Sequence, residues 1–237
     1  MNTTSSDSKR GMRIAVFAIA LVTPFLASLF YAVLFPGTKF GNAFYSGVKF
    51  FLLLWPMVAV FFLLKEKGTH LDRPREHRKS LFPGIGFGIA TVGLLVFLIK
   101  GTPLGAVVDD NAANIVTFVE KLGVAEHFLW FALFISFAHA ALEEFYWRWF
   151  ALGEGRKLMS FGWANLIAGV GFASHHIVIL NQFFPMGWAL FLGACVAIGG
   201  MVWSWIFHRY NSILGPWVSH MIIDLGLMWV GWEVLQG

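Results

Sequence analysis

The sequence contains seven long apolar stretches, and this feature limits the folds open to the chain more than any other. They cover residues 13–35, 44–64, 81–99, 127–150, 161–180, 185–207 and 213–235. About 20 consecutive apolar residues suffice to cross a bilayer as a helix. Only 13% of the residues are charged, against about 25% in a soluble domain. We therefore expect an all-α membrane protein, a polytopic bundle of about seven transmembrane helices, or eight if a re-entrant segment is present.

The positive charges predict how this bundle is oriented. Placing the N-terminus in the cytoplasm puts thirteen of the 17 Lys and Arg residues on the cytoplasmic side. Lys39, Lys100 and Lys121 then lie outside, and Lys49 lies within the second span. This asymmetry follows the positive-inside rule. We expect a cytoplasmic N-terminus, an external C-terminus and, from the small size and short loops, a bacterial inner membrane. The first apolar stretch is longer than a signal-peptide core and is interpreted as an uncleaved helix.

The chain is expected to form one continuous membrane domain with two regions. Residues 1–126 carry three spans, a basic loop at 65–80 and a segment at 109–123 whose apolar spacing predicts an amphipathic helix on the outer surface. Residues 127–237 carry the other four spans. The basic loops are short and adjoin membrane segments, so the expected partner is membrane lipid and not nucleic acid.

Two further residue types carry structural predictions. Gly84, Gly86, Gly88 and Gly93 follow one another in the third span, which indicates close helix packing. The single cysteine, Cys195, excludes an internal disulfide and is interpreted as a small buried hydrophobe.

Ionisable residues inside the spans are the main functional candidates, because burying such groups in a bilayer costs several kcal/mol. They gather on the fourth, fifth and seventh spans, with Lys49 apart on the second. They are His139, Glu143, Glu144, Arg148, His175, His176, His220 and Asp224.

The two adjacent glutamates of the fourth span have different expected partners. Glu144 and Arg148 are four residues apart, so their side chains meet on one helix face and can form an ion pair. Glu143 points about 100° away, and it needs a partner from another helix or a bound proton. Either environment suits a general base. The alternative is a salt bridge at the helix end beside a glutamate that reaches towards the membrane surface.

The histidines also occur at helical spacing. Phe172 and His176 share one face of the fifth span, whereas His175 points elsewhere and is expected to make a packing hydrogen bond. His220 and Asp224 share a face of the seventh span, and local pairing of these two is the alternative to a functional role. At about 1.5 Å per residue, Glu143, His220 and Asp224 lie roughly 11–17 Å from the inner helix ends, and His176 lies about 22 Å from them.

Taken in order, three motifs resemble the CPBP family of intramembrane proteases, also called the CAAX prenyl protease and bacteriocin-processing, or Abi, family. The motifs are Glu-Glu-x-x-x-Arg at 143–148, Phe-x-x-x-His at 172–176 and His-x-x-x-Asn/Asp at 220–224. The resemblance covers roughly residues 127–226, so residues 127–237 would form the catalytic core. It implies a membrane-embedded endopeptidase whose substrate is a peptide or a lipidated protein.

The resemblance also implies the roles of the residues in these motifs. Glu143 with His176 would activate a water molecule, and His220 with Asp224 would form the oxyanion hole. The Glu144–Arg148 pair would hold the first motif in place. Prenyl-processing members carry Asn where this chain has Asp224, so Asp224 must hold a proton or orient His220, because an ionised carboxylate would repel an oxyanion.

The resemblance implies a metal-independent mechanism, so we expect no cofactor and no metal ligands. Zinc is the alternative, because Glu143, His176, His220 and His139 are suitable ligand types, although the His-Glu-x-x-His pattern is absent from the sequence. Two other functions stay open. One is a non-proteolytic scaffold that binds another membrane protein, and the other is a proton-coupled transporter that uses the same groups as a relay.

Overall fold

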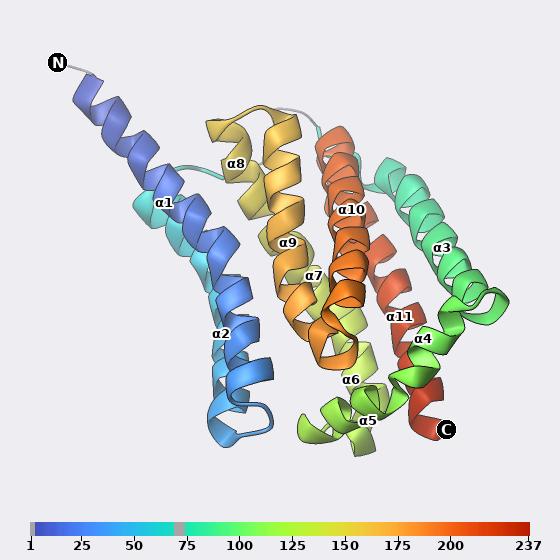
Figure 1. Ribbon diagram of the computed structural model, residues 1–237. Coiled ribbons are helices and arrows are strands. Elements are labelled where there is room, and N and C mark those ends of the chain that lie inside the picture. Colours follow the sequence, from blue (N-terminus) through green and yellow to red (C-terminus); the bar gives the residue numbers. More distant parts are fainter. Residues whose placement is uncertain (1–2, 69–73) are drawn as a thin grey trace.

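The computed structural model describes residues 3–68 and 74–237, and in that part of the chain the regular structure is all helical, without strands. Seven helical segments are long and apolar enough to cross a membrane, which confirms the predicted all-α membrane architecture. Figure 1 shows that the axes of the long helices are roughly aligned, with the two chain ends at opposite ends of the bundle. An odd number of crossings requires this separation of the termini.

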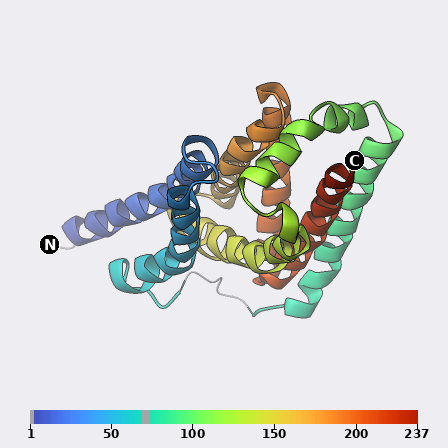
Figure 2. The same cartoon turned by 90° about the horizontal axis from the view of Figure 1, so that it is seen from below.

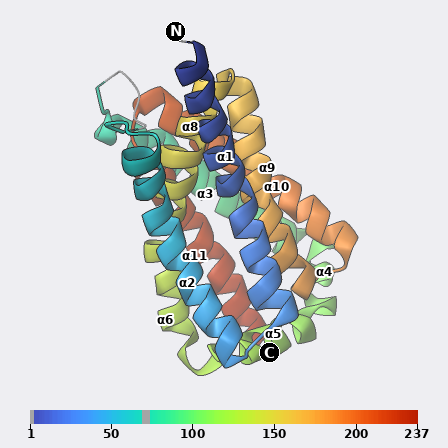
Figure 3. The same cartoon turned by 90° about the vertical axis from the view of Figure 1, so that its left-hand side faces the viewer.

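The first two spans lie on one side of the bundle, and the third lies on the other side, next to the last span (Figure 1). Their elements are α1 (Thr3–Ser28) with the π-helix η1 (Leu29–Leu34), α2 (Lys39–Met57) with the π-helix η2 (Val58–Leu63), and α3 (His77–Gly101). In Figure 3, α1 and α2 stand in front of the remaining helices. The predicted basic loop at 65–80 is shorter than expected, because α3 already begins at His77; its residues 69–73, including Arg73, lie outside the described residues.

The fourth span is interrupted, whereas the last three are continuous. It consists of the 3-10 turn η3 (Ala125–His127), α6 (Phe128–Leu133), the π-helix η4 (Phe134–His139), α7 (Ala140–Glu144), the π-helix η5 (Phe145–Leu152) and α8 (Gly153–Leu158). The last three spans are α9 (Phe161–Phe183), α10 (Met186–Tyr210) and α11 (Leu214–Gln236). A π-helical turn holds an extra residue, so it rotates every side chain that follows relative to an α-helix.

Two short helices connect the third and fourth spans, α4 (Leu104–Asp110) and α5 (Ala112–Lys121). The helix predicted at 109–123 is therefore present, but it begins later and breaks at Asn111. Its apolar side chains Phe118 and Val119 are buried, and the Phe118 ring lies 5.2 Å from that of Phe183 on α9. Figure 2 shows α5 crossing the end of the bundle. Its apolar face thus packs on the protein itself.

The third and last spans approach each other closely through glycines. A Cβ atom on Gly84 would lie 2.3 Å from the carbonyl oxygen of Gly215, and one on Gly88 would lie 3.2 Å from that of Ser219. Gly86 and Gly93 face open space. The predicted close packing is therefore confirmed for Gly84 and Gly88, which face α11, and was wrong for Gly86 and Gly93. Cys195, which we expected to be buried, is exposed on α10.

At the N-terminal end of the bundle, a charge cluster joins three separate segments. Arg13 Nε on α1 lies 3.0 Å from Glu154 Oε2 on α8, and Lys157 Nζ lies 2.8 Å from Glu154 Oε1. Glu66 pairs with both Arg13 and Lys157. Partial burial acts to raise the pKa of Glu66, but the hydrogen bond from Lys157 and the charges of Lys157, Arg13 and Lys9 bring this pKa below its usual 4.5. The cluster fixes α8 against α1.

Candidate active site

The fourth span places two adjacent glutamates at the centre of the bundle. Glu143 and Glu144 end α7, a five-residue α-helical piece between the two π-helices η4 and η5. Both side chains are buried, with 3% and 0% of their surface exposed. Tyr146 and Trp147, at the start of η5, are also buried, and the Tyr146 hydroxyl donates to the carbonyl of Ala20 on α1. π-Helical turns are frequent at functional sites.

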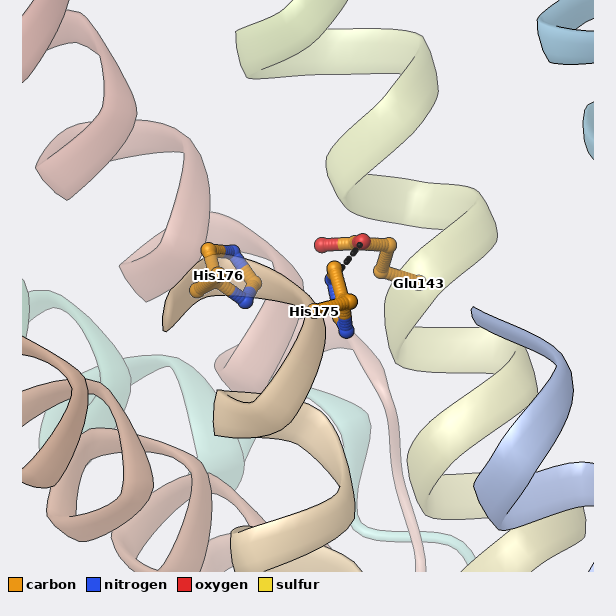
Figure 4. Close-up of side chains that lie close together, drawn as sticks. All are labelled: Glu143, His175 and His176. Carbon is orange, nitrogen blue, oxygen red and sulfur yellow. Dashed lines mark hydrogen bonds and ion pairs between the residues drawn. The ribbon is translucent and has the colours of Figure 1, made fainter. Parts of the chain in front are cut away.

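Glu143 is surrounded by histidines from three spans. Its Oε1 atom lies 3.1 Å from His175 Nε2 on α9 and 3.3 Å from His139 Nε2, one turn earlier on its own span. Its Oε2 atom lies 3.8 Å from His220 Nε2 on α11. Figure 4 shows the Glu143 carboxylate pointing at His175, with His176 beside it. Glu143 therefore contacts side chains from other helices, as the sequence predicted.

His175 is the main site residue that the sequence analysis placed wrongly. It was expected to point away, but it is buried and hydrogen-bonds Glu143 directly. Its ring also lies parallel to that of Trp147, 5.9 Å away. The cause is the close crossing of α9 and the fourth span, which lets α9 present two adjacent side chains to the same carboxylate. Spacing within one helix cannot reveal such a crossing.

One ring nitrogen of His176 has an identified hydrogen-bond partner. Its Nδ1 atom lies 2.9 Å from the carbonyl oxygen of Phe172, and a carbonyl only accepts, so Nδ1 must carry the proton. In the neutral ring, Nε2 then keeps its lone pair. One ligand atom each of Glu143, His175 and His176 lies within 4.8 Å of the other two. A small molecule at this point would meet a carboxylate and an accepting imidazole together.

Glu144 connects two spans. Its Oε2 atom lies 3.0 Å from Arg148 Nε, as the four-residue spacing predicts, and its Oε1 atom lies 2.9 Å from His220 Nδ1. Arg148 also donates to the carbonyl of Gly200 on α10, at 3.3 Å. The guanidinium lies between the rings of Phe172 and Trp203, at 4.7 and 5.0 Å from their centroids. The ion pair is therefore enclosed by protein on all sides.

His220 and Asp224 complete the cluster from α11. His220 Nε2 lies 3.6 Å from Asp224 Oδ2, which is longer than a hydrogen bond. The His220 ring stacks on Trp203 at 4.3 Å, and Trp203 donates to Ser219 Oγ at 3.0 Å. His220 Nδ1 is thus engaged by Glu144, while Nε2 faces the space between Glu143 and Asp224.

The apparent mismatch in depth disappears in the structure. The fourth span extends to Leu158, so fifteen residues separate Glu143 from its end, and fifteen also separate Phe161 from His176. At about 1.5 Å per residue, both lie about 22 Å from these neighbouring helix ends. The last span begins deeper than the others, because Gly215 lies against Ser80 and Gly84, one to two turns inside α3. His220 therefore lies close to the depth of Glu143 and His176.

Residues 125–226 match a protein-family model described as type II CAAX prenyl endopeptidase, Rce1-like. The matched Rce1-like region contains all three motifs and begins just after the connection between the third and fourth spans. The resemblance is therefore confirmed. No curated protein and no solved structure matches the chain. The match and the seven apolar helices support an integral membrane protein with CAAX-type protease activity. The division at about residue 126 stays a prediction.

Proposed function

We propose that this protein is an intramembrane endopeptidase in which Glu143 is the general base for the attack of water on a peptide bond. The observation that carries the proposal is the convergence on Glu143 of His139, His175 and His220 from three spans. A base must lie within hydrogen-bond reach of the water it deprotonates, directly or through one partner. We place this water between Glu143 and His176, which each have a ligand atom within 4.8 Å of the other.

The proposed reaction uses the cluster in two steps. In the first, Glu143 takes one proton from water while His176 Nε2 accepts a hydrogen bond from the other, and the hydroxide oxygen bonds to the substrate carbonyl carbon. In the second, the carbon–nitrogen bond breaks and Glu143 returns its proton to the departing amine. His175 holds the carboxylate in place through its 3.1 Å contact. Positioned acid–base groups of this kind contribute about 10²- to 10⁴-fold in rate.

His220 is the proposed donor to the oxyanion. Its Nδ1 atom donates to Glu144 at 2.9 Å, and a proton on Nε2 would point towards the carbonyl oxygen. A donor aimed at the developing charge is worth about 3–4 kcal/mol. Asp224 Oδ2, at 3.6 Å from Nε2, would favour a doubly protonated ring. We therefore propose that Asp224 supports His220 and does not itself contact the oxyanion in its ionised form.

The proposed substrate is a peptide or a lipid-modified chain that reaches the site from the membrane, in the cytoplasmic half of the bilayer. Purified protein in lipid nanodiscs should cleave an internally quenched, farnesylated peptide with a C-terminal CAAX sequence, or its unprenylated form. Peptides that accumulate in cells with wild-type protein but not with Glu143→Gln would reveal other substrates. Glu143→Gln keeps the shape of the side chain but cannot accept the proton, so cleavage should be abolished.

Glu120→Gln is a matched control, because Glu120 is exposed on α5, away from the cluster. It should cleave like wild type. If Glu143→Gln also cleaves at the wild-type rate, the proposed reaction is wrong. If no peptide differs between the two strains and neither probe is cut, the non-proteolytic scaffold becomes the better interpretation.

We further propose that catalysis needs no metal ion. The ligand atoms of Glu143, His175 and His176 could also converge on zinc, so this requires a test of its own. Activity should be unchanged after dialysis against a strong chelator, and elemental analysis of the active protein should find no stoichiometric metal. Loss of activity that zinc restores would assign these residues as metal ligands instead.

A further inference from the structure

Lys49 on α2 is a charged residue that the three motifs leave unexplained. It lies ten residues into α2, inside the second span. Its Nζ atom lies 3.2 Å from His139 Nδ1, 3.3 Å from His139 Nε2 and 4.4 Å from the centre of the Tyr45 ring. A lysine at this depth is costly unless a counter-charge is near. His139, which Lys49 contacts, also contacts such a counter-charge, the carboxylate of Glu143.

His139 stands between Lys49 and the proposed base. Its Nε2 atom lies 3.3 Å from Glu143 Oε1, and its side chain is 15% exposed. An imidazole that accepts a hydrogen bond from an ammonium on one nitrogen donates from the other. Lys49, His139 and Glu143 thus form a polar chain from α2 to the active site, and α2 packs beside the fourth span to permit it (Figure 3).

The other charged groups around Glu143 come from the fourth span and α11, and Lys49 is the cation that α2 supplies. Arg148 is already paired with Glu144, which it contacts at 3.0 Å. On the far side, His220 Nε2 lies 3.8 Å from Glu143 Oε2, and the positive charge proposed for this ring is shared with Glu144 and Asp224, which both contact it. His175 and His176 approach from α9 and carry no charge in their neutral forms. A carboxylate buried among these groups is stabilised as an anion by a nearby cation.

We infer that Lys49 is a positioning residue for catalysis, acting through His139 to hold the Glu143 carboxylate ionised and correctly oriented. This inference rests on the proposed function of Glu143. Lys49 lies outside the Rce1-like region at residues 125–226. The second span would therefore contribute to the active site through Lys49.

Lys49→Met tests the inference, with Lys49→Arg as the charge-preserving variant and Lys39→Met as a matched control. Lys39 is exposed at the start of the same helix. On a cleaved peptide, Lys49→Met should lower kcat about 10- to 100-fold with little change in KM, since the effect of the charge is on the base. Lys49→Arg should recover most of the loss, and Lys39→Met should match wild type.

A double-mutant cycle separates a chain through His139 from simple destabilisation. If Lys49 acts through His139, adding Lys49→Met to His139→Gln should lower kcat no further. Wild-type kcat in Lys49→Met, or losses that multiply in the double variant, would overturn the inference. Melting temperatures measured alongside identify any variant that has lost its fold.

Infrared spectroscopy decides the same question without any substrate. The Glu143 signal is identified by its loss in Glu143→Gln, and it should be that of a carboxylate in wild type and of a protonated carboxyl in Lys49→Met. An ionised signal in both proteins would overturn the inference. Absence of cleavage by wild type, together with the expected infrared change, would contradict the protease assignment and leave the role of Lys49 in ionisation intact.

Discussion

The Nδ1 atom of His220 on α11 lies 2.9 Å from Oε1 of Glu144 on α7. This contact joins the last span to the fourth at the centre of the protein. The opposite oxygen of Glu144 is held by Arg148 at 3.0 Å. Glu144 is therefore engaged on both sides, while its neighbour Glu143 faces the space into which His176 and His220 project. Adjacent residues of identical chemistry thus have different surroundings.

From this difference we predict that Glu144→Gln destabilises the protein, whereas Glu143→Gln does not. Without Glu144, the buried Arg148 loses its counter-charge and His220 loses its partner, at a cost of roughly 3–5 kcal/mol. The yield of detergent-solubilised protein and its melting temperature should both fall, together with activity. Glu143→Gln should keep a near-normal melting temperature and lose turnover alone, because Lys49, whose counter-charge is removed, can release its proton, whereas Arg148 cannot. If Glu144→Gln is inactive at full stability, the two roles are reversed.

The two adjacent histidines of α9 should respond differently to substitution. His176→Ala removes the group that accepts a hydrogen bond from water, and we expect kcat to fall about 10²- to 10⁴-fold. His175→Ala removes one hydrogen bond to a charged carboxylate, about 1.5–3 kcal/mol, or roughly 10- to 150-fold. His175→Gln places an amide near the original Nε2 position and should recover part of this loss. Equal kcat values for His175→Gln and His175→Ala would contradict a hydrogen-bonding role.

The sequence predicted the helices well, because hydropathy alone decides which segments cross a bilayer. It also predicted pairs within one helix, such as Glu144 with Arg148, since these depend on spacing alone. Contacts between helices were predicted less completely. The role of His175 depends on how closely α9 crosses the fourth span, and the depth of His220 depends on the glycines of α3.

Lys49 and His139 show what was missed and which signal was available. Both are ionisable residues within spans, and the four-residue spacing of His139 and Glu143 placed these two on one face. Nothing in the sequence indicated that α2 lies beside the fourth span, because packing partners of membrane helices depend on the whole bundle. The π-helical turns η4 and η5 also shift side-chain directions away from those of a regular helix.

The orientation in the membrane gives a prediction that is independent of catalysis. Lys67→Cys lies in the loop before the third span and Ala113→Cys lies on α5 in the connection after it, and both native side chains are exposed. In a Cys195→Ala background, which is needed because Cys195 is exposed, a membrane-impermeant maleimide should label residue 113 in intact bacterial cells. It should label residue 67 only after the membrane is opened. The reverse pattern would place the N-terminus outside, against the distribution of positive charge.

The approach of α3 to α11 should control both stability and activity. A Cβ on Gly84 would lie 2.3 Å from the Gly215 carbonyl oxygen, so Gly84→Ala forces the two helices apart. Overpacking of this kind costs about 1–3 kcal/mol. Because α11 carries His220, the same displacement should move His220 away from Glu144 and lower kcat.

Gly86→Ala on the same helix is the matched control, because nothing lies within 4 Å of the added carbon. It should leave activity unchanged and hold or slightly raise the melting temperature, since alanine favours a helix over glycine. The measurements are melting temperature and kcat for both variants in the same lipid. If Gly84→Ala behaves like Gly86→Ala, α11 is not held by this contact, and the depth of His220 must be set elsewhere in the bundle.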